Sequence, residues 1–424
     1  MSRRFLFVLW DGGGSVPPQL AVARRLVERG HEVRAIAPQV LRARVEAAGC
    51  AFVPYRRAPE HDSRERERDL LRDWEAHTPL GMLALVRDRV SVGPALAFAE
   101  DTLEELERRP ADAMATDYLL LGPLAAAERA GVPAAALFHQ IYTLPAPGVP
   151  VVGAGSLPAT GPLGRLRDAL MTAIYGRLFD RGLRGFNEVR ARLGLPPLAR
   201  LFDAIYRLDR ALVLTSQAFD LPSSGLPPNV RYVGAQLDDS AWTEPWRSPW
   251  PADHPDPLVV VSLSTTYQDQ RRVIENIIEA VGGMPVRALV TVGYSLDPGT
   301  FHAPANVAVR QYVPHVNVFP EAAAVITHAG HGTVVAALAH GVPLVCLPMG
   351  RDQHDNAARV VWRGAGVRLR AKSRPAAIRA ALRSVLDTPA YREGARRIAA
   401  QMAIEDSARL AVEELEALAV LGND

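Results

Sequence analysis

Residues 325–356 read VITHAGHGTVVAALAHGVPLVCLPMGRDQHDN, and the order of residue types in this stretch decides the fold. Val325–Thr327 is a short apolar run typical of a strand, and His328–Thr333 is a glycine turn after which apolar residues recur at helical spacing. A glycine and a proline end that helix, and Leu344–Leu347 reads as the next buried strand. The stretch therefore predicts a strand, a glycine turn, a helix and a second strand.

The turn after the first of these strands has the features of an anion site. Gly330 and Gly332 let a ligand approach the backbone, and the N–H groups of the first helical turn would point toward it. Thr333 adds a hydroxyl and His328 a side-chain donor, so a phosphate or diphosphate is the expected ligand. The simpler alternative is that the glycines only make a turn and Thr333 only caps a helix, and a short motif alone does not decide between the two.

A second polar cluster follows the next strand. Asp352-Gln353 and Asn356 come directly after a strand that ends at Pro348. Open α/β sheets hold their ligands at the carboxyl ends of strands. The two clusters therefore predict one pocket.

Length and charge limit the classes of function. A chain of 424 residues is expected to form two domains, and its apolar content of 48% is that of a globular protein. The net charge of +2 gives no large basic field for nucleic acid. Cys50 and Cys346 lie far apart in apolar settings, so we expect two buried thiols and neither a disulfide nor a metal site.

The first residues resemble the start of a signal peptide. Arg3-Arg4 precedes an apolar run, but Phe5–Trp10 is too short for a signal core or a membrane span. We therefore expect a cytoplasmic protein with no stable membrane insertion.

Alternating strands and helices predict an α/β fold in two halves. Phe5–Trp10, a glycine turn, a helix and Val33–Ala37 form a β-α-β start that lacks the G-x-G-x-x-G dinucleotide spacing. The further expected strands are Ala113–Thr116, Ala134–Phe138, Ala211–Thr215, Leu258–Leu263, Ala288–Val292, Val307–Val309, Val325–Thr327 and Leu344–Leu347. We expect an α/β unit at 1–220, a connection at 221–257, a second unit at 258–400 and a last helix at 401–424 that crosses back to the first unit.

Two irregular segments are expected to lie over the first unit. Residues 61–73 are dense in alternating charge and predict a solvated helix or loop, and residues 145–164 are rich in proline and glycine. The polar residues at strand ends belong to both halves: Asp11 to Ser15, Asp117 and His139, then Thr265, Gly293, His328 and Asp352. Two doubly wound, Rossmann-like domains would place these ends on the two sides of a cleft.

Several motifs of the second half occur together in one known family. They are Tyr312-Val313-Pro314-His315, Thr327–Thr333, Gly341-Val342-Pro343, Pro348 and Asp352-Gln353. In order and spacing over residues 312–353 the chain resembles the nucleotide-sugar domain of the family 1 glycosyltransferases of GT-B fold. It is most similar to bacterial enzymes that decorate antibiotics and other natural products. The Gly-x-Val-x-Pro turn at Gly14 and the helix end at Arg29–Val33 extend the resemblance to nearly the whole chain.

The resemblance implies a donor site in the second half and an acceptor site in the first. The implied diphosphate residues are Thr265, His328, Ala329, Gly330, His331, Gly332 and Thr333. Tyr312 and Val313 would contact the nucleobase, and Asp352 and Gln353 would hydrogen-bond the sugar hydroxyls. A nucleoside diphosphate sugar, linked to dTDP or UDP, would be the co-substrate. No ligand-spaced cluster predicts a metal or another cofactor.

The first turn departs from the family pattern. The family has a histidine at the position of Ser15, where it removes a proton from the acceptor hydroxyl, and an acidic residue near the position of Asp117 orients it. A serine hydroxyl does not titrate near neutral pH and cannot take this role. The sequence therefore leaves Asp117 without the expected partner.

Three interpretations of this departure stay open. Asp11 or Asp117 acts as the base directly, or His139 supplies the imidazole from a neighbouring strand end. In the third, the acceptor is a phenol, thiol or amine and needs little activation. Each of these residues also has a plain structural role available, as a turn cap, a hydrogen-bonded strand end or a pocket wall.

The sequence as a whole predicts an inverting glycosyltransferase that acts on a small hydrophobic natural product. A catalytically silent relative that binds a nucleotide sugar is the first rival, because of Ser15. A nucleotide-sugar epimerase of the same fold is the second. The sequence leaves the sugar, the acceptor, the linkage atom and a homodimeric state open.

Overall fold

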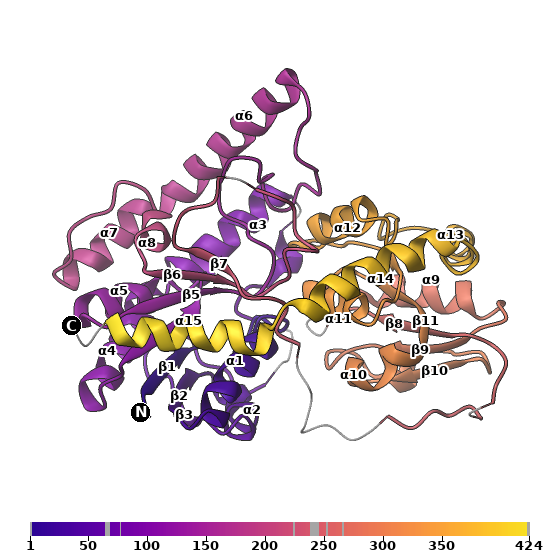
Figure 1. The fold of residues 1–424 in the computed structure, drawn as a ribbon, viewed down its shortest axis with the longest axis horizontal. Helices are drawn as coiled ribbons and strands as arrows, with labels where there is room; N and C mark the ends of the chain where they lie inside the picture. Colours follow the sequence, from indigo (N-terminus) through magenta and orange to yellow (C-terminus); the bar gives the residue numbers. More distant parts are fainter. Residues whose placement is uncertain are drawn as a thin grey trace.

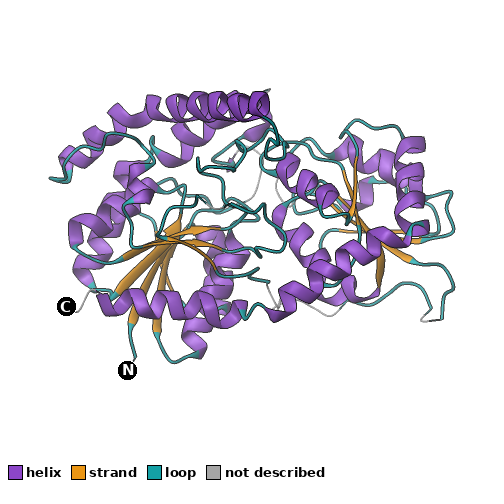
Figure 2. Cartoon of the chain, turned by 45° about the horizontal axis from the view of Figure 1, so that its top comes forward, coloured by secondary structure: helices purple, strands orange, loops and turns teal. Residues whose placement is uncertain are grey.

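The computed structural model describes residues 2–63, 68–76, 78–223, 225–237, 246–251, 253–264 and 267–421. Thr265, expected at the diphosphate, lies outside these residues. The described chain forms two parallel sheets, each covered by helices on both faces (Figure 2). This is the expected α/β fold with two doubly wound domains.

The first sheet has seven parallel strands in the order β3-β2-β1-β4-β5-β6-β7. Their bounds are β1 Arg4–Val8, β2 Glu32–Ala37, β3 Ala51–Pro54, β4 Ala113–Asp117, β5 Ala134–Phe138, β6 Arg210–Val213 and β7 Val230–Tyr232. In β1, Phe5 and Phe7 face one apolar core while Leu6 and Val8 face another. Burial on both faces explains the unbroken apolar run of this strand.

Among the described residues, eight α-helices belong to the first half. They are α1 Val16–Glu28, α2 Arg42–Ala47, α3 Pro79–Val86, α4 Ala95–Arg108, α5 Leu121–Ala130, α6 Pro162–Phe179, α7 Leu183–Arg192 and α8 Asp203–Tyr206. α1 and α2 cover one face, and α4, α5, α7 and α8 cover the other. α6 projects away from the sheet at the top of the molecule (Figure 1).

The second sheet has six parallel strands in the order β10-β9-β8-β11-β12-β13. Their bounds are β8 Leu258–Ser262, β9 Arg287–Thr291, β10 Val307–Arg310, β11 Ala322–Thr327, β12 Leu344–Cys346 and β13 Gly366–Arg368. Its helices are α9 Arg271–Val281, α10 His315–Val318, α11 His331–Ala339, α12 Gln353–Trp362, α13 Pro375–Asp387 and α14 Pro389–Ile404. α9 and α13 cover one face and α11, α12 and α14 the other.

The chain returns to the first domain after the second sheet is complete. α15, Ser407–Leu421, packs beside α1 on the first sheet, as the yellow helix in Figure 1 shows. Val412, Leu415 and Leu418 are fully buried there. β7 lies within residues 221–257, the stretch expected to connect the two sheets, and pairs with β6 instead, so the first sheet extends into that stretch.

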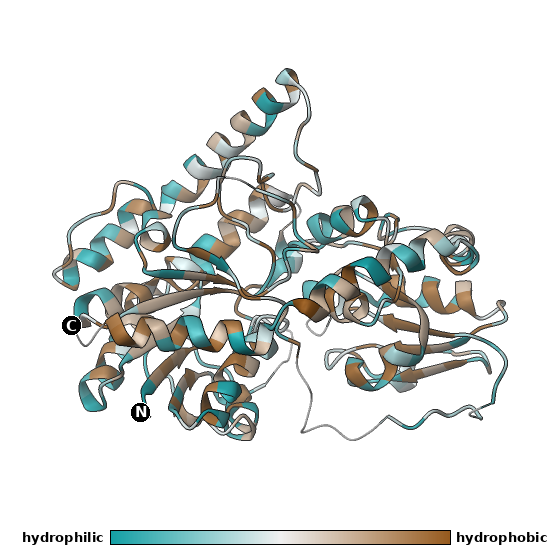
Figure 3. Ribbon diagram, viewed as in Figure 1, coloured by the Kyte–Doolittle hydropathy of each residue, from teal (hydrophilic) through white to brown (hydrophobic). Residues whose placement is uncertain are grey.

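Apolar residues concentrate in the strands and on the inner sides of the helices, which gives each domain cores above and below its sheet (Figure 3). Cys50 and Cys346 lie in these cores as free thiols, as expected, and burial raises the pKa of each to about 12. No helix among the described residues combines the length and apolar character that a membrane crossing requires.

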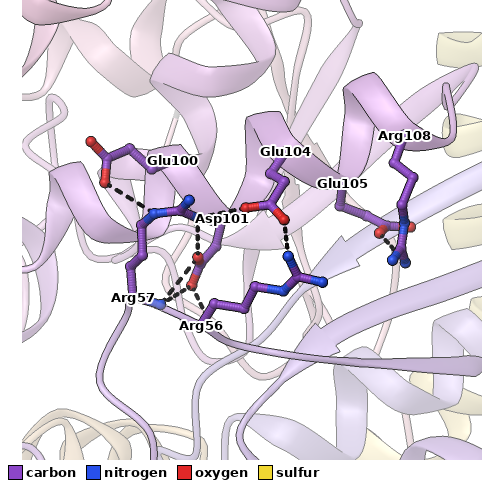
Figure 4. A network of polar contacts seen from close by, with 7 residues as sticks. All are labelled: Arg56, Arg57, Glu100, Asp101, Glu104, Glu105 and Arg108. Carbon is purple, nitrogen blue, oxygen red and sulfur yellow. Dashed lines mark hydrogen bonds and ion pairs between the residues drawn. The ribbon is translucent and has the colours of Figure 1, made fainter.

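The loop after β3 is fixed to α4 by one buried carboxylate. Asp101 accepts hydrogen bonds from the backbone N–H groups of Arg56 (2.9 Å), Arg57 (3.0 Å) and Ala58 (3.0 Å). Arg56 and Arg57 also form ion pairs with Glu104 on the same helix (Figure 4). This anchoring directs the following residues toward the turn after β1.

Candidate active site

A carboxylate and an imidazole meet where β4 and β5 end. His139 Nδ1 lies 2.8 Å from Asp117 Oδ2, and Gln19 Nε2 donates to the same oxygen at 2.8 Å. The other oxygen of Asp117 accepts from the backbone N–H of Leu119 at 3.0 Å. Asp117 is fully buried, whereas the side chain of His139 stays 14% exposed. With Nδ1 donating to the carboxylate, Nε2 carries the lone pair that can accept a proton.

The first turn provides no histidine partner for Asp117, and the histidine that contacts it comes from the end of β5. Parallel pairing of β4 with β5 brings Asp117 opposite Leu137, so that His139 follows at the same edge. Ser15 lies at the start of α1, is 2% exposed, and its hydroxyl has no hydrogen-bond partner among the described residues. Its backbone carbonyl accepts from Gln19, so Ser15 helps to orient the glutamine that holds Asp117.

Asp11 is engaged in the turn itself. Its Oδ1 accepts from the backbone N–H of Gly13 at 3.1 Å, and its Oδ2 lies 3.8 Å from Nε2 of His61. This geometry is that of a turn cap, and it favours His139 over Asp11 as the proton acceptor.

The expected anion turn lies between β11 and α11. The left-handed conformation falls on Ala329, with φ of 66°, and not on a glycine. Thr327 Oγ1 accepts from the N–H of Ala329 at 3.2 Å, and Asn356 Nδ2 donates to the carbonyl of Ala329 at 3.0 Å. The turn is thus supported from both sides before the helix begins at His331.

The imidazole of His328 lies against Gly330. A Cβ at Gly330 would lie 2.6 Å from Nε2 of His328, so the glycine is required for close approach. Burial, and then the charge of Arg351, lowers the pKa of His328 to about 4. At neutral pH His328 is therefore an uncharged donor beside the amides of the α11 N-terminus, where Gly332 and Thr333 follow. This set can hold a diphosphate without a charged histidine.

The sugar-binding pair expected at the start of α12 is tightly organised. Asp352 Oδ2 accepts from Asn356 Nδ2 at 2.7 Å, and burial raises the pKa of Asp352. Gln353 Oε1 accepts from the N–H groups of Met349 (2.8 Å) and Gly350 (3.0 Å). The two side chains are thereby fixed in one orientation below the turn of Ala329.

The residues expected at the nucleobase, Tyr312 and Val313, follow the end of β10. Tyr312 stacks on Tyr294 at 5.8 Å between ring centroids, and Val313 is buried. His315 Nε2 lies 3.0 Å from the hydroxyl of Ser262, which ties this segment to the end of β8. Tyr294 directly follows Gly293, one of the strand-end positions expected from the sequence. An aromatic residue beside that position was the signal that could have pointed to Tyr294.

His331 contributes to the contact between the domains. Its Nε2 lies 2.8 Å from the hydroxyl of Thr215 in the first domain. Burial, and then the charge of His139, lowers the pKa of His331 to about 3. Burial raises the pKa of Asp352, and the nearby His139 acts against this effect. The imidazole of His139 therefore lies near both Asp352 and His331.

A cavity of about 680 Å³ lies in the first domain beneath the proline-rich loop. Its walls include Pro147, Val149, Ala173, Phe202 and Tyr206. The loop that forms one wall begins after His139, and Tyr206 donates to the carbonyl of Pro145 at 3.0 Å. Among the described residues, no group of three or more His, Cys, Asp or Glu side chains is arranged to hold a metal ion.

Comparison with known proteins identifies the family of the chain. Residues 275–418 match the family described as erythromycin biosynthesis protein CIII-like, C-terminal domain. The chain is 34% identical to 4'-demethylrebeccamycin synthase of Lentzea aerocolonigenes over 426 residues, which cover 99% of this chain and 100% of that protein.

Solved structures show the same fold. The glycosyltransferase of kitacinnamycin superimposes with a TM-score of 0.78 at 21% identity, over 98% of this chain and 99% of that chain. Spinosyn rhamnosyltransferase SpnG complexed with thymidine diphosphate gives a TM-score of 0.70 at 17% identity, over 98% and 100%. Because the sequence similarity extends over the full length of a named relative and the two sheets have the same arrangement, the chain belongs to the family 1 glycosyltransferases of GT-B fold that act in antibiotic pathways.

Proposed function

We propose that the protein is an inverting glycosyltransferase that uses His139 as its general base. In this proposal the donor is a sugar linked to dTDP or UDP, and the acceptor is a small hydrophobic natural product. The observation that carries the proposal is the 2.8 Å contact between Asp117 and His139 at the edge of the first sheet.

The dyad supplies what the family histidine supplies from another position. Asp117 accepts three hydrogen bonds, which fix the orientation of its carboxylate. The carboxylate orients the imidazole and stabilises the imidazolium that forms when His139 takes up a proton. The departure at Ser15 therefore moves the base to another strand without removing it, and the motivation for a catalytically silent protein is weakened.

The donor side is supported by the turn and by the relatives. Neutral His328, the N-terminus of α11 and Thr333 suit a diphosphate, and one structural neighbour is described in complex with thymidine diphosphate. In the proposed reaction the acceptor oxygen forms a bond to the anomeric carbon while the bond from that carbon to the diphosphate breaks. The electron pair leaves with the diphosphate, and the acceptor proton passes to Nε2 of His139. A single displacement of this kind inverts the anomeric configuration.

The acceptor is expected in the first domain. The cavity beneath the proline-rich loop is lined largely by apolar residues, which favours a hydrophobic ring system. A phenol would present an acidic proton, whereas an aliphatic alcohol would depend more strongly on His139.

The proposal is tested by kinetics of His139→Asn and Asp117→Asn with a transferred alcohol, beside Ser15→Ala as the matched control. The first two variants should lower kcat by about a hundred- to ten-thousand-fold, since they remove or misorient the base. Their binding of dTDP or UDP should persist, whereas His328→Ala should weaken it. Ser15→Ala should stay within about threefold of the unchanged protein, because its hydroxyl has no partner among the described residues.

Equal activity of His139→Asn and the unchanged protein would reject this base assignment. Nucleotide binding without transfer to any acceptor would favour the silent relative, and conversion of the donor without acceptor would favour an epimerase.

A further inference from the structure

Asp73 is a buried carboxylate at the end of the charged segment that the sequence predicts to be solvated. It begins a short 3₁₀ helix, Asp73–Glu75, and its side chain is 3% exposed. The prediction that residues 61–73 form a solvated segment is therefore wrong for Asp73, because its side chain is buried against residues of the second domain. Its Oδ2 accepts from Arg351 Nε at 2.6 Å and from Gln268 Nε2 at 2.7 Å.

Both partners of Asp73 are attached to the expected sugar-binding pair. Arg351 directly precedes Asp352 in the chain, and Gln268 Oε1 accepts from Gln353 Nε2 at 2.9 Å. The carboxylate of Asp73 is thus held between the neighbours of Asp352 and Gln353. The charge of Arg351 also lowers the pKa of His328, which places the same cation close to the diphosphate turn.

The second carboxylate oxygen of Asp73 takes no part in these hydrogen bonds. Oδ1 is buried and has no hydrogen-bond partner among the described residues, although a buried carboxylate oxygen normally has one. Oδ2 already accepts two hydrogen bonds, so the orientation of the carboxylate is fixed. A ligand group that donates a hydrogen bond would satisfy Oδ1.

The backbone around this carboxylate is strained. Among the described residues, four that are not glycine have positive φ: Arg72, Asp269, Ala329 and Arg351. Arg72 directly precedes Asp73, and Arg351 pairs with it. Asp269 directly follows Gln268, and Ala329 lies in the turn between β11 and α11. Such conformations persist where the surrounding structure enforces them, often at ligand sites.

We infer that Asp73 contacts the donor sugar and helps to select it, with Oδ1 accepting a hydrogen bond from a hydroxyl or amino group of that sugar. This inference rests on the proposed function and extends it, because it makes the first domain contribute to sugar recognition. Arg351 and Gln268 are positioning residues that hold the carboxylate in place.

The test compares the dissociation constants of dTDP and UDP with those of their glucose, rhamnose and amino-sugar conjugates. For the best-bound sugar nucleotide, Asp73→Ala should weaken binding by about ten- to a hundredfold, the range of a hydrogen bond to a charged group. Binding of the bare nucleotide should change by less than about threefold, because it lacks the sugar. A neutral hydroxyl would tolerate Asp73→Asn better than an ammonium group, which separates the two kinds of donor group.

Glu75→Ala is the matched control. Glu75 lies on the same 3₁₀ helix but pairs with Arg89 of the first domain at 2.6 Å, so its loss should leave the ratio of the two constants unchanged. The inference is overturned if Asp73→Ala weakens sugar nucleotide and bare nucleotide by the same factor, or leaves both unchanged for every conjugate. If the unchanged protein binds neither dTDP nor UDP, the proposed function fails as well, so the two failures are distinguishable.

Discussion

At Gly330 the backbone leaves no room for a side chain, because the ring of His328 lies where a Cβ would be. Two residues further on, Gly332 has open space around the same position. The two glycines of one turn thus serve different purposes. Gly330 allows the protein to pack against itself, and Gly332 keeps space open in front of the helix.

This difference gives a prediction for two single substitutions. Gly330→Ala should displace His328 and cost about 1–3 kcal/mol of stability, as overpacking usually does, and should weaken nucleotide binding by about tenfold or more. Gly332→Ala should leave the melting temperature within about 2 °C of the unchanged protein, since the added methyl group meets no protein atom. Calorimetry with and without dTDP or UDP measures both effects. A stable Gly332→Ala variant that has lost nucleotide affinity would show that the ligand occupies this space.

At the scale of elements, α12 holds most parts of the site together. Its first turns supply Asp352 and Asn356 to the donor turn and Gln353 to Gln268. In the same first turn, Asp355 accepts from the backbone N–H groups of Gly153 (2.5 Å) and Gly155 (2.9 Å). The proline-rich loop of the first domain is therefore tied to the helix that begins at Gln353.

Detaching this loop is the second prediction. In Gly155→Ala the new Cβ would lie 2.8 Å from both Arg368 Nη1 and the carbonyl oxygen of His354, so the loop should leave α12. Gly148→Ala is the matched control, because φ is positive at both glycines but Gly148 has open space around it. We expect Gly155→Ala to be cleaved in this loop several-fold faster by a protease and to raise the KM for the acceptor more than that for the donor. Equal cleavage rates of the two variants would argue against a tie through α12.

The sequence predicted elements well where burial leaves a simple pattern. The interior strands are apolar on both faces, and the sequence located them to within a few residues. β3, β7 and β13, which it did not identify, lie at sheet edges, are short, and carry residues such as Pro54 and Arg231. Edge strands resemble loops in sequence, because one side of their backbone is unpaired.

The candidate site likewise has one part that the sequence predicts and another that depends on the fold. The turn between β11 and α11 and the start of α12 lie close together in sequence, so motif and spacing were sufficient to predict these elements, and their role at a donor stays a prediction. The pairing of Asp117 with His139 depends on which strands are neighbours, and the sequence could offer it only as one of three options. Asp73 was missed because its local surroundings are charged, and only the fold shows that it reaches Gln268 and Arg351.

At the scale of the whole molecule, buried histidines should make stability depend on pH. Burial is the main cause that lowers the pKa of His315 and His328 to about 4 and of His331 to about 3. The unfolded chain then binds protons near pH 6.5, before the folded protein does, so stability should be complete above pH 6.5 and should fall as the pH drops toward 4. Asp355 acts in the opposite sense, since burial raises its pKa to about 6.

The third prediction follows from these signs. The melting temperature should be lower at pH 5 than at pH 7, and His331→Gln should reduce this loss, because one of the buried histidines with a lowered pKa no longer titrates. His331 also faces His139, Asp220, Arg359 and Thr215, and glutamine can keep the hydrogen bond to the threonine. Exposed His302→Gln is the control and should leave the pH profile unchanged. A His331→Gln profile identical to that of the unchanged protein would contradict the assignment.

The placement of α15 has a consequence for how the protein is made. The strands of the first sheet are complete once Tyr232 has left the ribosome, but the apolar face between α1 and β4 waits for Val412, Leu415 and Leu418. The whole second domain is synthesised in the interval. Until then the first domain presents an uncovered apolar surface to the cell, and chaperones that bind such surfaces have their longest opportunity there. Folding of the first domain therefore finishes last, although most of its chain is made first.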